Sequence, residues 1–362
     1  GGAQERGGAK SVGWGTPRSW CATRYRDPLL LLLSTMITCV SYATPELGRA
    51  GGGGVERQEL RLSSKKEVLG DWARDPALLE ELSSSFKSAD PFPHVVIPDF
   101  FSEAVAARIE AAFPIPKGEG SREWKAEGWH VYDNPIEGKL ALDDVERMKS
   151  HDDIFRDMWK ELQSTGLVSL LSDITGIDGL ENDPHLHGAG LHYHPPGSRL
   201  EMHLDYSIHP ITGKERRVNL IIYMNRDWDD DWGGELALWE GNPSEMTRGP
   251  VEKIKPRFNQ AALFRTSDIS WHGMPDPVRC PPGRARKSVA IYYVSEARAE
   301  ATPRYKAAYK ARPDDEIRDT AAFEGYSRLC ETRIQRRLEQ SDVVEALPGW
   351  LPRWPAGGGG GR

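Results

Sequence analysis

The sequence predicts a mainly β fold with flanking helices, arranged as a sandwich or a barrel. Between residues 188 and 295, short segments rich in β-branched and aromatic residues follow one another with no helical stretch between them. Gly, Pro, Asp and Asn separate these segments, as expected for tight turns. The segments are GAGLHYH, RLEMHLDYSI, RVNLIIYMN, GELALWE, QAALFRT and KSVAIYYVS. A parallel α/β sheet needs a long crossover after each strand, so the pattern argues against that class.

Helical patterns flank this β-rich region on both sides. Residues 71–86 show helical spacing, and a strand over Val95 to Ile97 precedes a helix for which Ser102 is the expected N-cap. Residues 152–171 carry apolar side chains on one helical face, and residues 303–347 show a further helical pattern. Because these segments lie before and after the strands, we expect the helices to pack against the outside of the sheet.

The ends of the chain have a different composition from its middle. Gly and Arg dominate the first residues, and five glycines stand at 357–361, which is typical of disorder. The resulting domain prediction has five parts along the chain. These are a disordered n-region with a signal peptide or signal anchor over 1–43, a linker over 44–70, one folded domain over 71–300, a C-terminal helical extension over 301–347 and a disordered tail over 348–362.

The N-terminal region follows the three-part plan of a secretory signal. Arg18, Arg24 and Arg26 precede an apolar run from Leu29 to Val40, and small residues precede a cleavage position after Ala43. This plan predicts the secretory pathway, either the endoplasmic reticulum or Golgi lumen or secretion. The alternatives are a signal anchor, or a short buried helix in a cytoplasmic protein, since the run is shorter than the roughly 20 residues of a transmembrane helix.

Charge and cysteine content limit the partners of the protein. The formal net charge of −7 gives no general attraction to a phosphate backbone, so nucleic acid is not an expected partner. A membrane is expected only if the N-terminal segment stays uncleaved. Cleavage after Ala43 would leave Cys280 and Cys330, which could form one disulfide in an oxidising lumen but have no metal-site spacing.

His203 and Asp205, in the segment EMHLDYSIHP, are candidate metal ligands. Residues two apart on a strand point to the same face, so an imidazole and a carboxylate project together from this segment. The spacing alone is weak evidence, because a chain with 10 histidines gives about one such pair by chance. His151 and Asp153 have the same spacing in a helical region, where residues two apart diverge. His209 in the same segment is expected to be a turn residue.

Two downstream features complete this candidate site. His272, at the end of the QAALFRT strand region, is the only histidine after His209 and can supply a third ligand, as Fe(II) facial triads require. Arg286 begins the last apolar strand, with Ser288 on the same face. Arg can hold a carboxylate in a bidentate fork, so this pair suits the distal carboxylate of an organic acid. A surface loop histidine and an exposed strand arginine are the alternative interpretations.

These residues, taken in order, resemble the 2-oxoglutarate and Fe(II)-dependent dioxygenases of the prolyl 4-hydroxylase-like branch. The resemblance also includes the segment PFPHVVIPDFFSEAVAARIEAAFP and covers roughly residues 90–296. It implies a double-stranded β-helix, or jelly-roll, over the domain at 71–300. It implies that His203, Asp205 and His272 bind Fe(II) and that Arg286 binds 2-oxoglutarate. It further implies a cosubstrate pocket lined by Tyr193, Tyr223, Ser288 and Leu236.

The resemblance implies an activity as well. An enzyme of this branch uses O2 to hydroxylate a C–H bond, most often of peptidyl proline, and releases succinate and CO2 from 2-oxoglutarate. Ascorbate is implied as a further cofactor. The same chemistry on a small metabolite, free amino acid or sugar is the alternative substrate class. A non-catalytic β-barrel binding module is the alternative function, and a complete triad with a cosubstrate arginine argues against it.

Some assignments stay open at this point. The segment from His272 to Arg286 is longer than usual for the branch, so Arg284 and Lys287 are alternative anchors, although strand alternation favours Arg286. The loop NRDWDDDWGG is a candidate lid or substrate rim, or simply an acidic turn. The expected rim residues are His192, His194, Trp228 and Trp232. Together with His185 and His187, the first two also allow a zinc or cupin interpretation, for which no Glu stands at the required spacing.

Overall fold

The computed structural model describes residues 67–118, 120–134, 136–310 and 312. The predicted signal region, most of the linker, Cys330, residues 313–347 of the expected extension and the tail lie outside this range. Among the described residues, no helix has the length and apolar character needed to cross a membrane.

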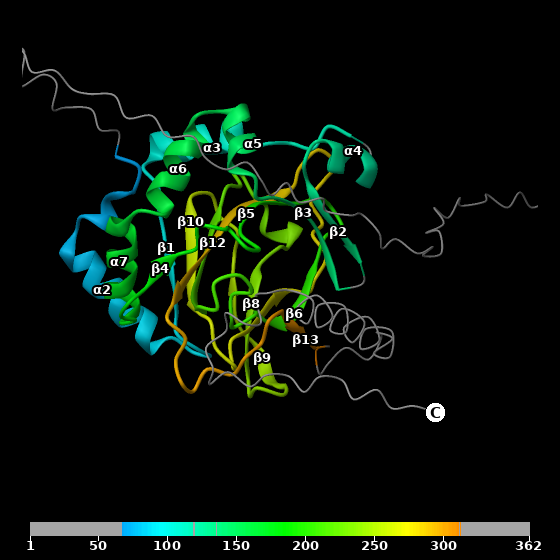
Figure 1. Cartoon of the computed structure of the whole chain (residues 1–362). Helices are drawn as coiled ribbons and strands as arrows, with labels where there is room; N and C mark the ends of the chain where they lie inside the picture. Colours follow the sequence, from blue (N-terminus) through cyan, green and yellow to red (C-terminus); the bar gives the residue numbers. More distant parts are fainter. Residues whose placement is uncertain (1–66, 119, 135, 311, 313–362) are drawn as a thin grey trace, which may run out of the picture. The chain divides into compact units, whose positions relative to one another are not determined.

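The described strands form one 13-stranded sheet, in which every pair is antiparallel. The main path through the sheet is β1-β10-β7-β12-β5-β3-β6-β11-β8-β9. The strands are β1 (His94–Ile97), β2 (His130–Asn134), β3 (Glu137–Leu142), β4 (Glu181–Asn182), β5 (Gly190–His194), β6 (Leu200–Leu204), β7 (Glu215–Tyr223), β8 (Leu236–Gly241), β9 (Met246–Ile254), β10 (Gln260–Arg265), β11 (Trp271–Met274), β12 (Arg286–Ser295) and β13 (Ala308–Tyr309). The sheet curves into a nearly closed barrel, so the predicted mainly β fold with a jelly-roll core is confirmed (Figure 1).

The helices lie outside the barrel, as expected, and most of them cover the face formed by β1, β10, β7 and β12 (Figure 1). They are α2 (Pro76–Ser88), α3 (Glu103–Ala112), α4 (Ser121–Ala126), α5 (Val145–His151), α6 (Ile154–Leu162) and α7 (Thr165–Thr175), with short 3-10 turns η1 (Asp71–Ala73) and η2 (Asp230–Trp232).

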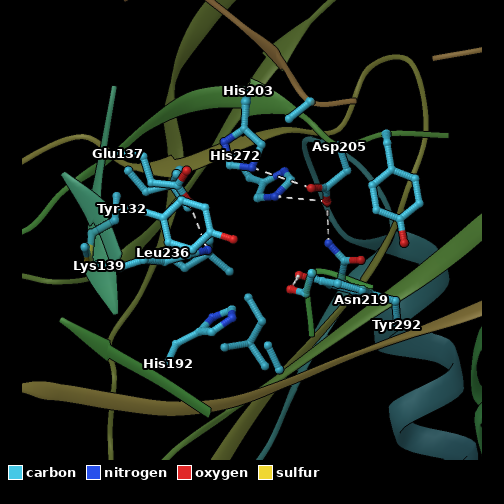
Figure 2. Close-up of a pocket in the computed structure, with 18 of the residues that line it drawn as sticks. Tyr132, Glu137, Lys139, His192, His203, Asp205, Asn219, Leu236, His272 and Tyr292 are labelled. Atoms are coloured by element: carbon cyan, nitrogen blue, oxygen red, sulfur yellow. Dashed lines mark hydrogen bonds and ion pairs between the residues drawn. The ribbon is translucent and has the colours of Figure 1, made fainter. Parts of the chain in front are cut away.

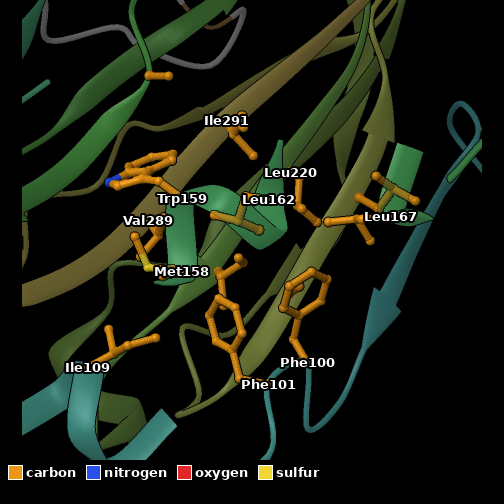
Figure 3. Packing of buried hydrophobic residues seen from close by; sticks show 14 of the residues in the cluster. Phe100, Phe101, Ile109, Met158, Trp159, Leu162, Leu167, Leu220, Val289 and Ile291 are labelled. Atoms are coloured by element: carbon orange, nitrogen blue, oxygen red, sulfur yellow. The ribbon is translucent and has the colours of Figure 1, made fainter. Parts of the chain in front are cut away.

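The alternation of β12 separates the core from the interior of the barrel. Val289 and Ile291 are fully buried and pack with Leu162 of α6 in the main hydrophobic cluster (Figure 3). Ser288 and Tyr292 point the other way and line a cavity inside the barrel. Burying the apolar face contributes roughly 1.5–3 kcal/mol per large side chain, so the helices fix the strand that carries the polar interior.

Three local expectations are corrected. The single helix predicted over 152–171 is two helices, because Ser164 Oγ accepts a hydrogen bond from Leu167 N at 3.0 Å and starts α7. Ser102 does stand at the N-cap of α3, but its hydroxyl donates to Glu67 O at 2.8 Å instead of capping the helix. In the expected C-terminal extension, residues 303–310 hold no helix; β13 pairs there with β6.

Candidate metal centre and its pocket

Two neighbouring strands bring His203, Asp205 and His272 together inside the barrel. His203 lies on β6 directly opposite His272 on β11, and Asp205 follows the end of β6. The carboxylate oxygens of Asp205 lie 3.6 Å from His203 Nε2 and 3.3 Å from His272 Nε2 (Figure 2). All three residues are buried, and the ligand atoms lie within 4.8 Å of one another. It is the only group of three or more candidate metal ligands in the described part of the chain.

Backbone carbonyls set the tautomer of both histidines. His203 Nδ1 lies 2.7 Å from Glu201 O, and His272 Nδ1 lies 2.8 Å from Ser270 O. A carbonyl oxygen can only accept a hydrogen bond, so each Nδ1 carries the proton and donates it. In the neutral imidazole, the form that binds a metal, Nε2 then keeps its lone pair, and in both histidines this atom faces Asp205. Such backbone contacts orient the histidine ligands of metal sites.

The Asp205 carboxylate is held by two donors on β7. Asn219 Nδ2 donates to Asp205 Oδ2 at 2.6 Å, and Arg216 Nη2 forms an ion pair with the same oxygen at 3.1 Å. Arg216 Nε also donates to Asn219 Oδ1 at 2.8 Å. Burial alone would raise the pKa of Asp205, but the positive charge of Arg216 outweighs it and holds the pKa well below its usual range. Asp205 is therefore a carboxylate, as a metal ligand must be.

Arg286 lies in the same cavity, which has a volume of about 280 Å³. Its Nε donates to Gly234 O at 2.7 Å, and its Cζ lies 4.8 Å from the ring centroid of Tyr223. Around it, buried polar atoms have no hydrogen bond of ordinary geometry; they are Tyr223 Oη, Ser288 Oγ and His194 Nδ1. Unpaired buried polar groups are costly, so this end of the cavity is built to receive a polar ligand.

A family model described as "2OG-Fe(II) oxygenase superfamily" matches residues 189–294. The matched span contains the buried triad and Arg286. The protein contains a 2OG-Fe(II) oxygenase domain.

Relatives of this domain include prolyl hydroxylases. Mouse prolyl 3-hydroxylase OGFOD1 is 22% identical over 214 residues, which are 58% of this chain but 34% of that protein, so the chain spans about a third of its length. A Pseudomonas putida prolyl-4-hydroxylase structure has a TM-score of 0.40 at 16% identity and covers 60% of this chain and 99% of its own. A prolyl 4-hydroxylase structure from Phytophthora capsici has a TM-score of 0.37 at 19% identity. The alignment covers 74% of this chain and 79% of that one.

The side chains of the oxygenase domain fit both iron and 2-oxoglutarate. Two histidine Nε2 atoms and one carboxylate are the donors of the facial triad that binds non-haem Fe(II). A buried arginine beside the buried hydroxyls of Tyr223 and Ser288 matches a carboxylate, which accepts several hydrogen bonds at once. The predicted ligand set and the predicted anchor therefore face one cavity of the oxygenase domain.

The alternative anchors are excluded by their positions. Arg284 Nη2 donates to the carbonyls of Arg226 and Asp227, at 3.2 and 3.1 Å, in an exposed loop. Lys287 Nζ binds Glu110 of α3 at 2.7 Å on the helix side of β12, facing as predicted with Val289 and Ile291. Neither side chain lines the cavity of the oxygenase domain.

The structure places most, but not all, of the predicted pocket residues at the cavity. Leu236, Ser288, His192 and His194 line the cavity, and Tyr223 lies behind Arg286. The placement of Tyr193 in the pocket is wrong: Tyr193 packs outside with Trp129, at a ring distance of 6.2 Å. On β5 the inward positions belong to His192 and His194, and strand alternation turns Tyr193 away.

Burial keeps the two inward histidines of β5 neutral. It lowers the pKa of His192 and His194 well below the usual value, and the nearby cations Lys139 and Arg286 lower it further. The other histidine pair forms no metal site. His187 packs edge-on against His209. The Nδ1 of His209 accepts from Ile211 N and Thr212 N at 3.1 Å, which confirms His209 as a turn residue.

The loop NRDWDDDWGG supports the pocket instead of forming its rim. Trp228 and Trp232 do not line the cavity; they pack with Met274 and Val278 in a separate cluster. The second glycine of the pair, Gly234, has φ +81° and offers its carbonyl to Arg286. A Cβ at this position would lie 3.1 Å from Arg286 Cδ, so glycine permits the close approach.

Sequence reasoning missed the residues that support Asp205. Arg216 and Asn219 are three positions apart, so on a regular strand their side chains would point to opposite faces. A bulge in β7 opposite Tyr293 and Val294 inserts Arg217 and turns Arg216 inward. The Arg216 Cζ then lies 3.2 Å from the ring centroid of Tyr292. No sequence signal marked this bulge.

The hairpin of β2 and β3 was also missed, although it forms one wall of the cavity. Tyr132, Glu137 and Lys139 project from it toward the triad (Figure 2). Lys139 Nζ and Glu137 Oε1 form a largely buried ion pair at 2.9 Å. Burial would lower the pKa of Lys139, but Glu137 reverses the effect and raises it, so the lysine is charged. The alternation of EGKLAL is the signal that could have indicated this strand.

Proposed function

We propose that the protein is a 2-oxoglutarate- and Fe(II)-dependent dioxygenase that hydroxylates a C–H bond of a peptidyl proline. The observation that carries the proposal is that the buried triad and the buried Arg286 face one cavity, with buried polar side chains around the arginine. A binding module would not need three metal donors and a dicarboxylate site together. The oxygenase domain match supports the same reaction class.

The chain's own residues bind, orient and exclude water. When bound, iron and 2-oxoglutarate supply the oxidation, in which 2-oxoglutarate and O2 give succinate and CO2 and one oxygen atom is inserted into a substrate C–H bond. His203, Asp205 and His272 would bind the iron from one side, leaving its remaining positions open. Arg286 and Ser288 would hold the distal carboxylate, with Leu236 as an apolar wall that keeps water away.

Peptidyl proline is the substrate class we favour. The relatives named above are prolyl hydroxylases, and the lining of the cavity is rich in tyrosine. It includes Tyr132, Tyr206, Tyr292, Tyr305 and Tyr309. Aromatic faces pack well against a proline ring, and their hydroxyls can bond the adjoining peptide groups.

A small polar metabolite, amino acid or sugar is the second candidate substrate. The Glu137–Lys139 ion pair favours it, because a charged acceptor and a charged donor stand together inside the cavity. An amino acid presents the complementary pair of charges, and a peptide carbonyl and amide present only partial charges. The pair is thus the feature that separates the two substrate classes.

Turnover assays test the reaction. Succinate release and O2 uptake should require added Fe(II) and 2-oxoglutarate, and His203→Ala and Asp205→Ala should abolish both. Turnover that survives both substitutions would refute the iron site. Mass spectrometry on a panel of proline-rich peptides and free amino acids should show a gain of one oxygen on a peptide. A gain confined to the free compounds would favour the second substrate class.

We propose that ascorbate maintains activity by re-reducing iron after uncoupled turnover, so its omission should shorten the linear phase of succinate release. From the N-terminal signal pattern we propose that the protein enters the secretory pathway. It would be attached to a membrane only if the signal segment is not cleaved. The formal net charge of −7 supports a substrate other than nucleic acid, because it gives no general attraction to phosphate groups. Microscopy of the tagged chain, with and without residues 1–43, tests this cellular location.

A further inference from the structure

We propose that residues 302–310, here called the C-terminal clasp, position all three metal ligands and are needed for tight metal binding. The clasp lies beyond the family match, which ends at residue 294. The inference rests on the proposed function only in that the triad binds a divalent metal.

The first contact is with the strand end that carries Asp205. Arg304 Nε donates to the backbone carbonyl of Asp205 at 2.6 Å. Ser207, two residues further on, is enclosed by the clasp: its hydroxyl donates to Thr302 O at 2.6 Å, and Arg304 N donates to that hydroxyl at 2.7 Å. Ser207 N also donates to Arg304 O at 2.6 Å. The chain on both sides of the Asp205 carbonyl is thereby fixed.

The same arginine reaches the turn that orients His272. Arg304 Nη1 forms an ion pair with Asp268 Oδ1 at 3.0 Å, with the arginine side chain 14% exposed. Asp268 belongs to the turn closed by Ser267 and Ser270, in which Ser270 Oγ accepts from Ser267 N at 2.9 Å. Ser270 O accepts the Nδ1 proton of His272. One guanidinium therefore connects the supports of two metal ligands that lie far apart in sequence.

The end of the clasp covers the third ligand. β13 pairs with β6 so that Tyr309 lies opposite His203 (Figure 1). The two rings stack at 5.0 Å with an angle of 31° between their planes. Lys310 N then donates to Met202 O at 3.0 Å and fixes the register. Tyr309 lines the cavity, so its ring limits where the imidazole of His203 can rotate.

These contacts give the clasp a role that packing alone does not require. The contacts of the clasp converge on the backbone carbonyl, the turn and the ring that orient the triad. Arg304 and Tyr309 are positioning residues, since both act through His203, Asp205 or the turn before His272. Substituting such outer partners typically costs ten- to a hundredfold in metal affinity.

Mn(II) titration of the metal-free protein, followed by the EPR signal of free Mn(II), tests the clasp. Arg304→Met and Tyr309→Ser should each weaken Mn(II) affinity by about tenfold or more. Tyr309→Phe keeps the stacked ring and should retain the parent affinity. Arg298→Met is the matched control. Arg298 also follows β12, but its guanidinium forms an ion pair with Glu215, at 2.6 Å, and not with a support of the triad.

Chemical denaturation of the metal-free variants separates positioning from folding. Parent-like Mn(II) affinity in Arg304→Met and Tyr309→Ser would overturn the clasp, and so would an equal loss in Arg298→Met. If Arg304→Met does not fold, the contrast between Tyr309→Ser and Tyr309→Phe decides. A parent that binds no Mn(II), or binds it unchanged after His203→Ala, would instead refute the metal centre itself and the clasp with it.

Discussion

Arg216 Nη2 lies 3.1 Å from Asp205 Oδ2, and both side chains are buried inside the barrel. The guanidinium is enclosed by aromatic rings, at 3.2 Å from the centroid of Tyr292 and 4.6 Å from that of Tyr206. A metal ligand is thus paired with a cation even before a metal binds. The pair neutralises a carboxylate that would otherwise be buried alone.

Arg216→Met should destabilise the metal-free protein by about 3 kcal/mol or more, because it leaves the Asp205 charge buried and unpaired. Mn(II) should recover much of this loss by supplying a positive partner, which denaturation with and without Mn(II) measures. Arg217→Met is the control, since this neighbour points outward and donates to Ser295 Oγ at 2.9 Å. The double variant Arg216→Met/Asp205→Asn should lose less free energy of unfolding than the two single variants lose in sum. Additive costs would show that the ion pair does not matter.

Arg286→Lys should raise the KM for 2-oxoglutarate by on the order of tenfold to a hundredfold, because a lysine cannot reproduce the bidentate fork. Mn(II) affinity should stay unchanged, since Arg286 offers no ligand to the triad. Lys287→Ala is the adjacent control, as that side chain binds Glu110 outside the cavity. A raised KM in the control and none in Arg286→Lys would place the dicarboxylate elsewhere.

Gly234→Ala should raise the KM for 2-oxoglutarate through a contact with Arg286. Its Cβ would lie 3.1 Å from Arg286 Cδ, and the backbone has φ +81°. Gly197→Ala is a matched control, because Gly197 has φ +84° but nothing within 4 Å of the added Cβ. Both variants carry the strain of about 1 kcal/mol expected for alanine at positive φ. Equal KM values in both would mean that the contact with Arg286 has no effect.

The parts of the site that could be predicted are those that depend on strand alternation within one strand. His203 and Asp205 share a face of β6 and its extension, and Ser288 shares one with Arg286, so both pairs follow from the period of two. Tyr193 could not be placed by its distance from His203, because the chain between them turns and the parity is lost. Arg216 required knowledge of a bulge, and Arg304 a return of the chain to β6.

Tyr223→Phe and Tyr193→Phe should behave differently, which tests the correction to the pocket. The hydroxyl of Tyr223 is buried beside Arg286, so its removal should raise the KM for 2-oxoglutarate several-fold. Tyr193 lies on the opposite face of β5 with Trp129, so its hydroxyl should not affect this KM. Steady-state kinetics with varied 2-oxoglutarate distinguish the two. An effect of Tyr193→Phe alone would restore the original assignment.

Asp183 should make folding stability depend on pH. Burial would raise the pKa of Asp183, but hydrogen bonding with His209 and with the backbone N–H groups of His185 and His187, at 2.9 and 2.8 Å, lowers it below the usual value. A carboxyl whose pKa is lower in the folded state stabilises the protein above its unfolded pKa of about 4. That stability is lost as pH falls through the lower folded value.

Asp183→Asn should therefore destabilise the protein by about 1–3 kcal/mol at pH 7, and the difference from the parent should shrink as the pH falls below about 4. Denaturant melts at several pH values measure this difference. Asp178→Asn is the control, because Asp178 is an exposed aspartate in the same region of the chain and should change stability little at any pH. The stability difference between the parent and Asp183→Asn could instead stay constant from pH 7 to pH 3. That result would show that the shape of the Asp183 side chain, and not its charge, stabilises this loop.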